Sequence, residues 1–156
     1  MRDDIKTLYV DFDGTLVASI DAIVDLYNED FQYYKKFHYV NWWTVNTYGF
    51  KECNCVSHGY SPNLIQKEEW IKKRFPNVEF IGVNFKEHSD KSHIDMSDGL
   101  FIDDSRKNLV TSNAKENICF GRTYSWNKDW TGKRLQNWAE IRQYLLGIGK
   151  EVTLEK

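Results

Sequence analysis

The chain has 156 residues, of which 41% are hydrophobic and 28% charged, a composition typical of one folded domain rather than a disordered segment. Its formal net charge is −2 and its pI is near 6.1, which gives no strong nucleic-acid signal because polyanion-binding domains are usually basic. No apolar run approaches the roughly 20 residues that span a bilayer, and the first residues do not resemble a signal peptide. With only three cysteines, too few for a disulfide framework, we expect a reduced, cytoplasmic protein without a membrane partner.

The first third of the chain predicts two strands separated by a helical insertion. Residues 7–11, TLYVD, form a continuous apolar run that is typical of a buried strand. From about Ser19, apolar residues recur at spacings of three and four, which predicts a helix. A polar and aromatic segment then leads to a second strand at 53–57. Residues of about 19–50 are therefore expected to form a small insertion after the first strand.

The remainder alternates helices and strands. Ser61 and Pro62 predict the start of a helix that continues to about residue 75, with serine as the N-cap and proline at the first helical position. In the last predicted helix, Asn137 is the N-cap and Gly147 the stop signal. The other predicted elements are strands at 78–83, 99–103 and 117–121 and a helix at 105–115.

This order of elements predicts the fold class. The strands are continuously apolar rather than alternating, as expected for a parallel sheet that is buried on both faces. We therefore predict an α/β fold, a three-layer sandwich in which helices cover a mainly parallel, Rossmann-like sheet. Residues 1–156 are expected to form a single domain.

Polar side chains follow the predicted strands, at the ends where ligands bind in parallel sheets. The residues in question are Asp11, Asp13, Ser57, His58, Asp103 and Asp104, with Lys91 between the third and fourth strands. Two aspartates at one strand tip repel each other, which proteins tolerate mainly where a cation or a reaction uses them. Carboxylate oxygens suit a hard cation, Mg²⁺ above all, and a lysine beside them is explained if a phosphate also binds.

These segments resemble the haloacid dehalogenase-like (HAD) phosphatases. DFDGT at 11–15 matches the first motif of that superfamily, and CNCVS, ending in Ser57, matches the second. Lys91 is the best match to the lysine of the third motif, and GLFIDD matches the acidic pair of the fourth. A more diffuse likeness to the 5'(3')-deoxyribonucleotidase family rests on the stretches WIKKRFP, DKS and LQNWAEI. That family has a larger helical cap, whereas residues of about 19–50 allow only a reduced cap.

The resemblance implies an Mg²⁺-dependent phosphomonoester hydrolase that acts through an aspartyl-phosphate. Asp11 would be the nucleophile, and Asp13 the general acid and base. Mg²⁺ would bind Asp11, the main-chain carbonyl of Asp13 and Asp104, whereas Asp103 would hold a metal-bound water. The phosphoryl group would be bound by Ser57, His58 and Lys91. Asn108 stands where the family often has a third acid, and can only support the site by hydrogen bonding.

Several alternatives stay open. Lys86 is a rival to Lys91, and His58 is also consistent with an ordinary turn position. Trp42 and Trp43 suit either stacking on a base or packing of the cap against the core. A (deoxy)nucleoside monophosphate is the favoured substrate, with a polynucleotide 3' end or another small phosphomonoester as alternatives. A catalytically idle domain that binds a phosphorylated ligand or a partner is the alternative from another class.

Overall fold

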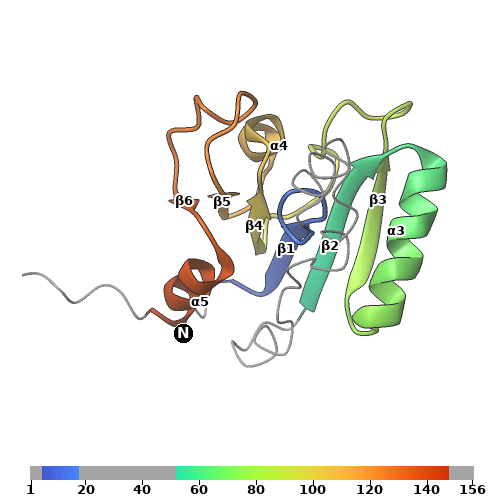
Figure 1. The fold of residues 1–156 in the computed structure, drawn as a ribbon, viewed down its shortest axis with the longest axis horizontal. Coiled ribbons are helices and arrows are strands. Elements are labelled where there is room, and N and C mark those ends of the chain that lie inside the picture. Colours follow the sequence, from blue (N-terminus) through green and yellow to red (C-terminus); the bar gives the residue numbers. More distant parts are fainter. Residues whose placement is uncertain (1–4, 18–51, 148–156) are drawn as a thin grey trace, which may run out of the picture.

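Figure 1 shows the computed structural model, which describes residues 5–17 and 52–147. Several predictions fall outside the described residues. They are the helix from Ser19, the insertion at about 19–50, and the roles of Trp42 and Trp43. The described part has an α/β fold with a six-stranded sheet in the order β3-β2-β1-β4-β5-β6. Every neighbouring pair of strands is parallel, as predicted.

The predicted strands are all confirmed, with shifts of one or two residues at their ends. The strands are β1 (Thr7–Asp11), β2 (Glu52–Gly59), β3 (Glu79–Asn84), β4 (Gly99–Asp103), β5 (Glu116–Phe120) and β6 (Arg134–Leu135). The helices are α3 (Ser61–Arg74), α4 (Arg106–Thr111) and α5 (Trp138–Leu146). Strand β6 was not predicted, because two residues are too short to show a pattern. Helix α4 is shorter than predicted, because Ser112 has an extended backbone with ψ of 144°.

The predicted N-cap of α3 is wrong by one residue. Tyr60 occupies the N-cap position with an extended backbone, and Ser61 is already the first helical residue. The Ser61 hydroxyl instead accepts a hydrogen bond from Asn84 Nδ2 at 3.0 Å, which ties the start of α3 to the end of β3. The predicted ends of α5 are confirmed: the Asn137 side chain caps its first turn, and Gly147 ends it in the left-handed conformation with φ of 69°.

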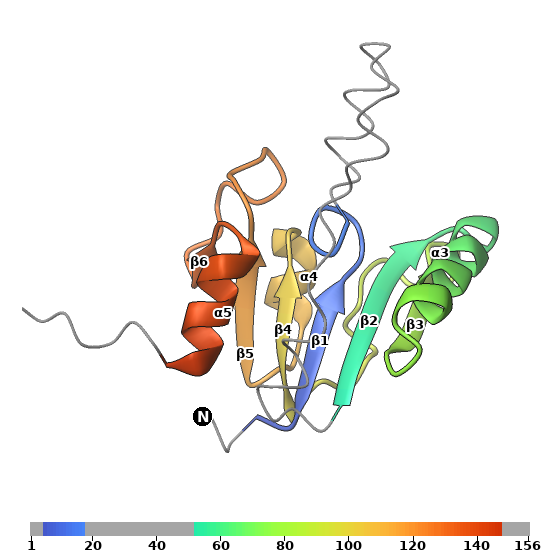
Figure 2. The same ribbon diagram turned by 60° about the horizontal axis from the view of Figure 1, so that its bottom comes forward.

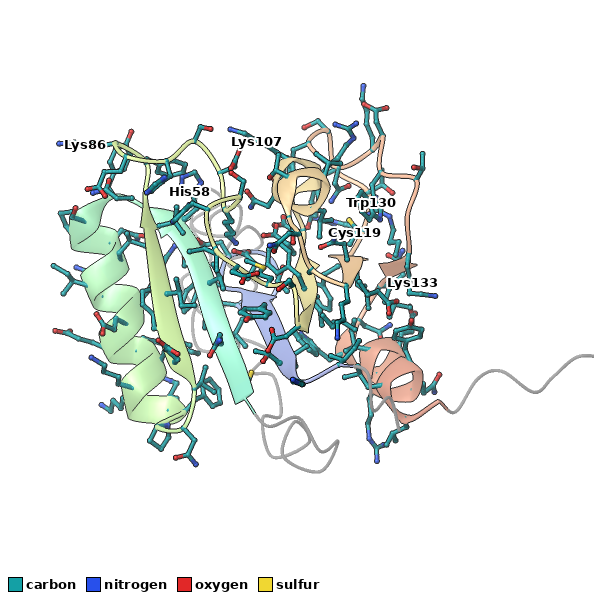
Figure 3. The ribbon with its side chains drawn as sticks, turned by 180° about the vertical axis from the view of Figure 1, so that it is seen from behind. His58, Lys86, Lys107, Cys119, Trp130 and Lys133 are labelled. Atoms are coloured by element: carbon teal, nitrogen blue, oxygen red, sulfur yellow. The ribbon has the colours of Figure 1, made fainter. Side chains whose placement is uncertain are left out.

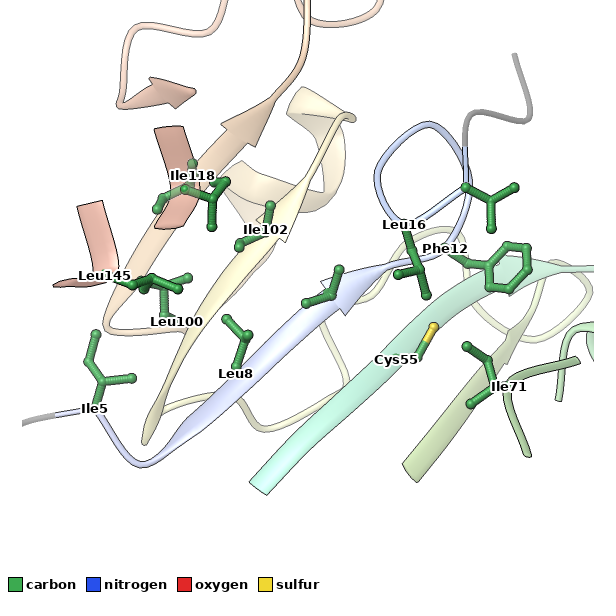
Figure 4. Packing of buried hydrophobic residues seen from close by; sticks show 13 residues of the cluster. Ile5, Leu8, Phe12, Leu16, Cys55, Ile71, Leu100, Ile102, Ile118 and Leu145 are labelled. Atoms are coloured by element: carbon green, nitrogen blue, oxygen red, sulfur yellow. The ribbon is translucent and has the colours of Figure 1, made fainter. Parts of the chain in front are cut away.

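Helices cover both faces of the sheet, which gives the predicted three layers (Figure 2). On one face, Ile71 of α3 and Ile141 and Leu145 of α5 pack against the strands. Figure 4 shows this cluster, in which the strand residues are Leu8, Val10, Cys55, Leu100, Ile102 and Ile118. On the other face, Leu109 of α4 and Met96 of the β3–β4 connection pack against Tyr9, Val56, Val83, Phe101 and Cys119. Each fully buried aliphatic side chain stabilises the fold by about 1.5–3 kcal/mol.

The sheet brings three strand ends together. Strand β1 lies between β2 and β4, where Asp11 is in register with Val56 and Val10 with Ile102. Residues that follow these strands therefore lie side by side at the carboxyl edge of the sheet. In the described part of the chain, no helix has the length and apolar character needed to cross a bilayer.

Candidate active site

The chain turns back on itself directly after β1. The backbone N–H of Val17 donates to the Phe12 carbonyl at 2.8 Å, and that of Gly14 donates to the Val17 carbonyl at 2.8 Å. Gly14 has φ of 73°, in the left-handed region that favours glycine. The turn therefore holds Asp11 and Asp13 at the tip of the central strand.

Asp11, Asp103 and Asp104 form a buried acidic cluster. One carboxylate oxygen of each lies within 4.8 Å of the others, and the three residues are 6%, 0% and 7% exposed. Burial raises the pKa of Asp11 well above its usual range, against the opposing effect of Lys91. Burial and the neighbouring charge of Asp103 raise the pKa of Asp104 to about 6. Ionised carboxylates at this place are therefore costly unless a cation compensates them.

Lys91 supplies one compensating charge from the β3–β4 connection. Its Nζ donates to Asp11 Oδ1, and to Asp103 Oδ2 at 2.7 Å, and the residue is 1% exposed. Burial by itself lowers the pKa of Lys91, but the charges of Asp103 and Asp11 outweigh burial and hold it above the usual range. The rival, Lys86, is exposed and lies at the edge of the structure beyond β3 (Figure 3). Lys91 contacts two of the three carboxylates, and if all three were ionised, its one positive charge would leave two negative charges in a buried place.

The two acids of the pair have different surroundings. Asp103 Oδ1 accepts a hydrogen bond from the Ser105 backbone at 2.7 Å, and Oδ2 accepts from Asn108 Nδ2 at 3.0 Å as well as from Lys91. Asn108 thus supports the site by hydrogen bonding, as expected. Asp104 Oδ2 accepts from the Trp126 indole N–H at 2.9 Å, whereas within the described residues its Oδ1 accepts no hydrogen bond. Asp104 therefore has the freer oxygen for a ligand.

A second buried lysine, Lys67, was not predicted from the motifs and contacts the loop after β1. Lys67 Nζ, from α3, donates to Asp13 Oδ2, and to Ser57 Oγ at 3.0 Å. Lys67 is 8% exposed and precedes the buried Ile71 by one helical turn, so it lies on the inner face of α3. A lysine at an inner position of an amphipathic helix is unusual, and that position is the sequence signal that could have identified it.

Ser57 and His58 diverge, because successive side chains of a strand point to opposite faces. Ser57 is buried and contacts Lys67. The His58 Nε2 lies 2.8 Å from the His88 carbonyl oxygen, and its ring centroid is 3.7 Å from that of Phe85. Burial lowers the pKa of His58. Figure 3 shows His58 on the side of the structure near the β3–β4 connection. The contacts place the predicted site residues in two groups. Asp11, Lys91, Asp103 and Asp104 form one, and Lys67 joins Asp13 to Ser57 in the other.

Comparison with protein families identifies the relatives of this chain. Residues 55–150 match the family described as 5' nucleotidase, deoxy (pyrimidine), cytosolic type C protein (NT5C), which is more than half of the sequence. The chain belongs to the NT5C family. This family is part of the HAD superfamily, so the resemblance inferred from the motifs is confirmed. No curated protein shows a significant match.

Membership of the NT5C family makes the chain a nucleotidase-type phosphatase, a phosphoric monoester hydrolase. The matched region contains Ser57, Lys67, Lys91 and the acidic pair. Asp11 and Asp13 precede it, and the structure joins them to it through Lys91 and Lys67.

Proposed function

We propose that the protein is an Mg²⁺-dependent nucleotidase that hydrolyses (deoxy)nucleoside monophosphates through an aspartyl-phosphate on Asp11. The observation that carries this proposal is the contact of Asp11 with Lys91 inside the buried acidic cluster. The family description names deoxy pyrimidine nucleotides, which supports a nucleotide as substrate. It also names a cytosolic type, which supports a cytosolic location for this protein. We further propose that residues 1–156 form a single phosphatase domain with a reduced cap.

The acidic cluster fits a hard divalent cation. Its donors are carboxylate oxygens, which Mg²⁺ prefers. With all three carboxylates ionised, Lys91 would leave two negative charges, which match the charge of one such ion. Asp11, Asp104 and the main-chain carbonyl of Asp13 would hold the ion, with Asp103 supporting them through a water molecule. The bound ion would supply charge neutralisation at the phosphoryl oxygens.

Asp11 would attack phosphorus with one of its carboxylate oxygens. Lys91 engages its Oδ1, which leaves Oδ2 as the nucleophilic oxygen. The bond from Oδ2 to phosphorus forms as the bond from phosphorus to the nucleoside oxygen breaks. Lys91, Lys67 and the Ser57 hydroxyl would stabilise the negative charge on the transferring group. For His58 a contact with phosphate stays a prediction, since its ring already contacts His88 and Phe85.

Asp13 would carry the proton in both half-reactions. Its side chain is 44% exposed, so water can reach it. It protonates the leaving nucleoside oxygen, and then takes a proton from the water that attacks the aspartyl-phosphate. Lys67 contacts both Asp13 and Ser57. Lys67 therefore lies where its ammonium group would also contact a phosphoryl group bound beside Ser57.

A substrate panel tests the proposal. Deoxynucleoside 5'- and 3'-monophosphates, a sugar phosphate, a 3'-phosphorylated oligonucleotide and p-nitrophenyl phosphate are compared, in Mg²⁺ and in EDTA. We expect the highest kcat/KM with a mononucleotide, loss of turnover in EDTA and its recovery with added Mg²⁺. A preference for sugar phosphates would refute the nucleotidase proposal, and a preference for the oligonucleotide would indicate a 3'-phosphatase. Binding of Mg²⁺ without turnover of any ester would indicate an idle domain.

A further inference from the structure

The loop between β5 and β6 contacts Asp104 through two adjacent residues. The Trp126 indole N–H donates to Asp104 Oδ2 at 2.9 Å. Asn127 Nδ2 donates to the main-chain carbonyl of Asp104 at 2.8 Å, and Asn127 is fully buried. One loop therefore fixes both the carboxylate and the peptide group of this acid.

The same loop is itself held in place. Arg134 of β6 donates from Nη2 to the Asn127 carbonyl at 2.8 Å and from Nη1 to Asn127 Oδ1 at 3.3 Å. The Tyr124 backbone N–H also donates to Asn127 Oδ1, at 2.8 Å. The Tyr124 ring stacks on Trp126, with centroids 4.4 Å apart and an interplanar angle of 6°. Trp126 is 43% exposed, so its orientation rests on the stack against Tyr124 and on the hydrogen bond to Asp104.

We propose that Trp126 is a positioning residue for the metal site, which holds Asp104 Oδ2 and leaves Oδ1 to bind the cation. This inference rests on the proposed function, because it requires a metal at Asp11 and Asp104. A carboxylate that is free to rotate loses that freedom when it binds a metal, whereas here the rotation is already restricted. Hydrogen-bond partners of metal-binding carboxylates typically contribute about 10–100-fold to metal affinity.

The chemistry of the donor supports this assignment. An indole N–H is neutral, so it orients the carboxylate without cancelling the charge that attracts the cation. Asp103, by contrast, is paired with the ammonium group of Lys91. The two adjacent acids thus have different roles. Asp103 binds Lys91, whereas Asp104 is oriented by Trp126 and keeps its charge for the metal.

Replacement of Trp126 with phenylalanine isolates the hydrogen bond. The variant keeps an aromatic ring against Tyr124 but lacks the N–H donor. Tyr124→Phe is the matched control, because it keeps both the stack and the donor. Mg²⁺ affinity is measured by calorimetry on the EDTA-treated full chain without substrate. We expect Trp126→Phe to weaken Mg²⁺ binding about 10–100-fold, and Tyr124→Phe to change it less than about twofold.

Two further readouts separate positioning from a general structural role. Excess Mg²⁺ should restore the kcat of Trp126→Phe with a mononucleotide, which it would not do if the loop had collapsed. In the wild-type protein, the assigned indole N–H resonance of Trp126 should shift on Mg²⁺ titration, which needs no variant.

The outcomes distinguish this inference from the proposed function. If the wild-type chain binds no Mg²⁺, both fail. If the wild-type chain binds Mg²⁺ but Trp126→Phe binds it within a factor of two, and the indole resonance does not move, only the role of Trp126 is refuted.

Discussion

Removing the ammonium group of Lys91 from the acidic cluster should destabilise the protein strongly. In Lys91→Met, the side chain keeps its approximate length, but Asp11 and Asp103 lose the buried ammonium group, whose side chain is 0% exposed. Breaking a buried ion pair by removing one partner costs about 3–5 kcal/mol, because a buried charge is left uncompensated. Since Lys91 contacts two carboxylates, we expect the upper part of that range. For a chain of this length, each kcal/mol lowers Tm by about 2–4 °C, so the expected loss is on the order of 8–20 °C in EDTA.

Thermal and urea denaturation in EDTA measure this loss, with Lys86→Met as the matched control. Lys86 is exposed beyond β3, and we expect its substitution to change the unfolding free energy by less than about 0.5 kcal/mol. Added Mg²⁺ should recover part of the stability of Lys91→Met, because it supplies positive charge to the same carboxylates. A Lys91→Met protein as stable as the Lys86→Met protein would refute the assignment of Lys91 as the compensating cation.

Four further substitutions address the catalytic and metal-binding roles. Asp11→Asn should abolish nucleotide turnover with the fold retained in circular dichroism, because an amide is a poor nucleophile; more than about a tenth of the wild-type rate would contradict covalent catalysis. Asp104→Asn should weaken Mg²⁺ binding in calorimetry by more than about 100-fold and Asp103→Asn by about tenfold, since direct ligation costs more than indirect support; the reverse order would exchange their roles. Lys67→Met should lower kcat/KM roughly 10–150-fold, as expected for loss of one hydrogen bond to a charged group, with Mg²⁺ affinity unchanged. An equal loss in Lys73→Met, on the exposed side of α3, would instead indicate a general effect on the helix.

The sequence was informative where one physical pattern decides the outcome. Continuous apolar runs such as TLYVD predicted buried parallel strands, because both faces of this sheet are covered. The aspartates at 11 and 103–104 stand at the ends of these strands, and that position predicts that they lie close together. Lys91 was selected from the motif order, and its burial agrees with that choice.

The sequence was less informative where a contact between distant segments decides the position of a side chain or the end of a helix. Lys67 lies 54 positions from Asp13. Most lysines on a helix are solvated, so its residue type predicts an exposed side chain, and its contact with Asp13 cannot be read from the local sequence. The start of α3 shifted by one residue, and there the hydrogen bond from Asn84 engages the Ser61 hydroxyl that would otherwise cap the helix. Trp126 contacts Asp104 across 22 positions of the chain, from a loop in which Arg134 of β6 binds the next residue, Asn127.

The central place of β1 has a consequence for synthesis of the chain. Thr7 begins a strand whose partners are β2, starting with Glu52, and β4, starting with Gly99. At about 5–20 residues per second, the apolar TLYVD segment leaves the ribosome several seconds before β4 exists. Until then this strand lacks one of its two neighbours, and an unpaired apolar strand is prone to aggregate. The nascent chain is therefore expected to need chaperone protection, and chains that end before residue 99 should be recovered mainly as insoluble protein.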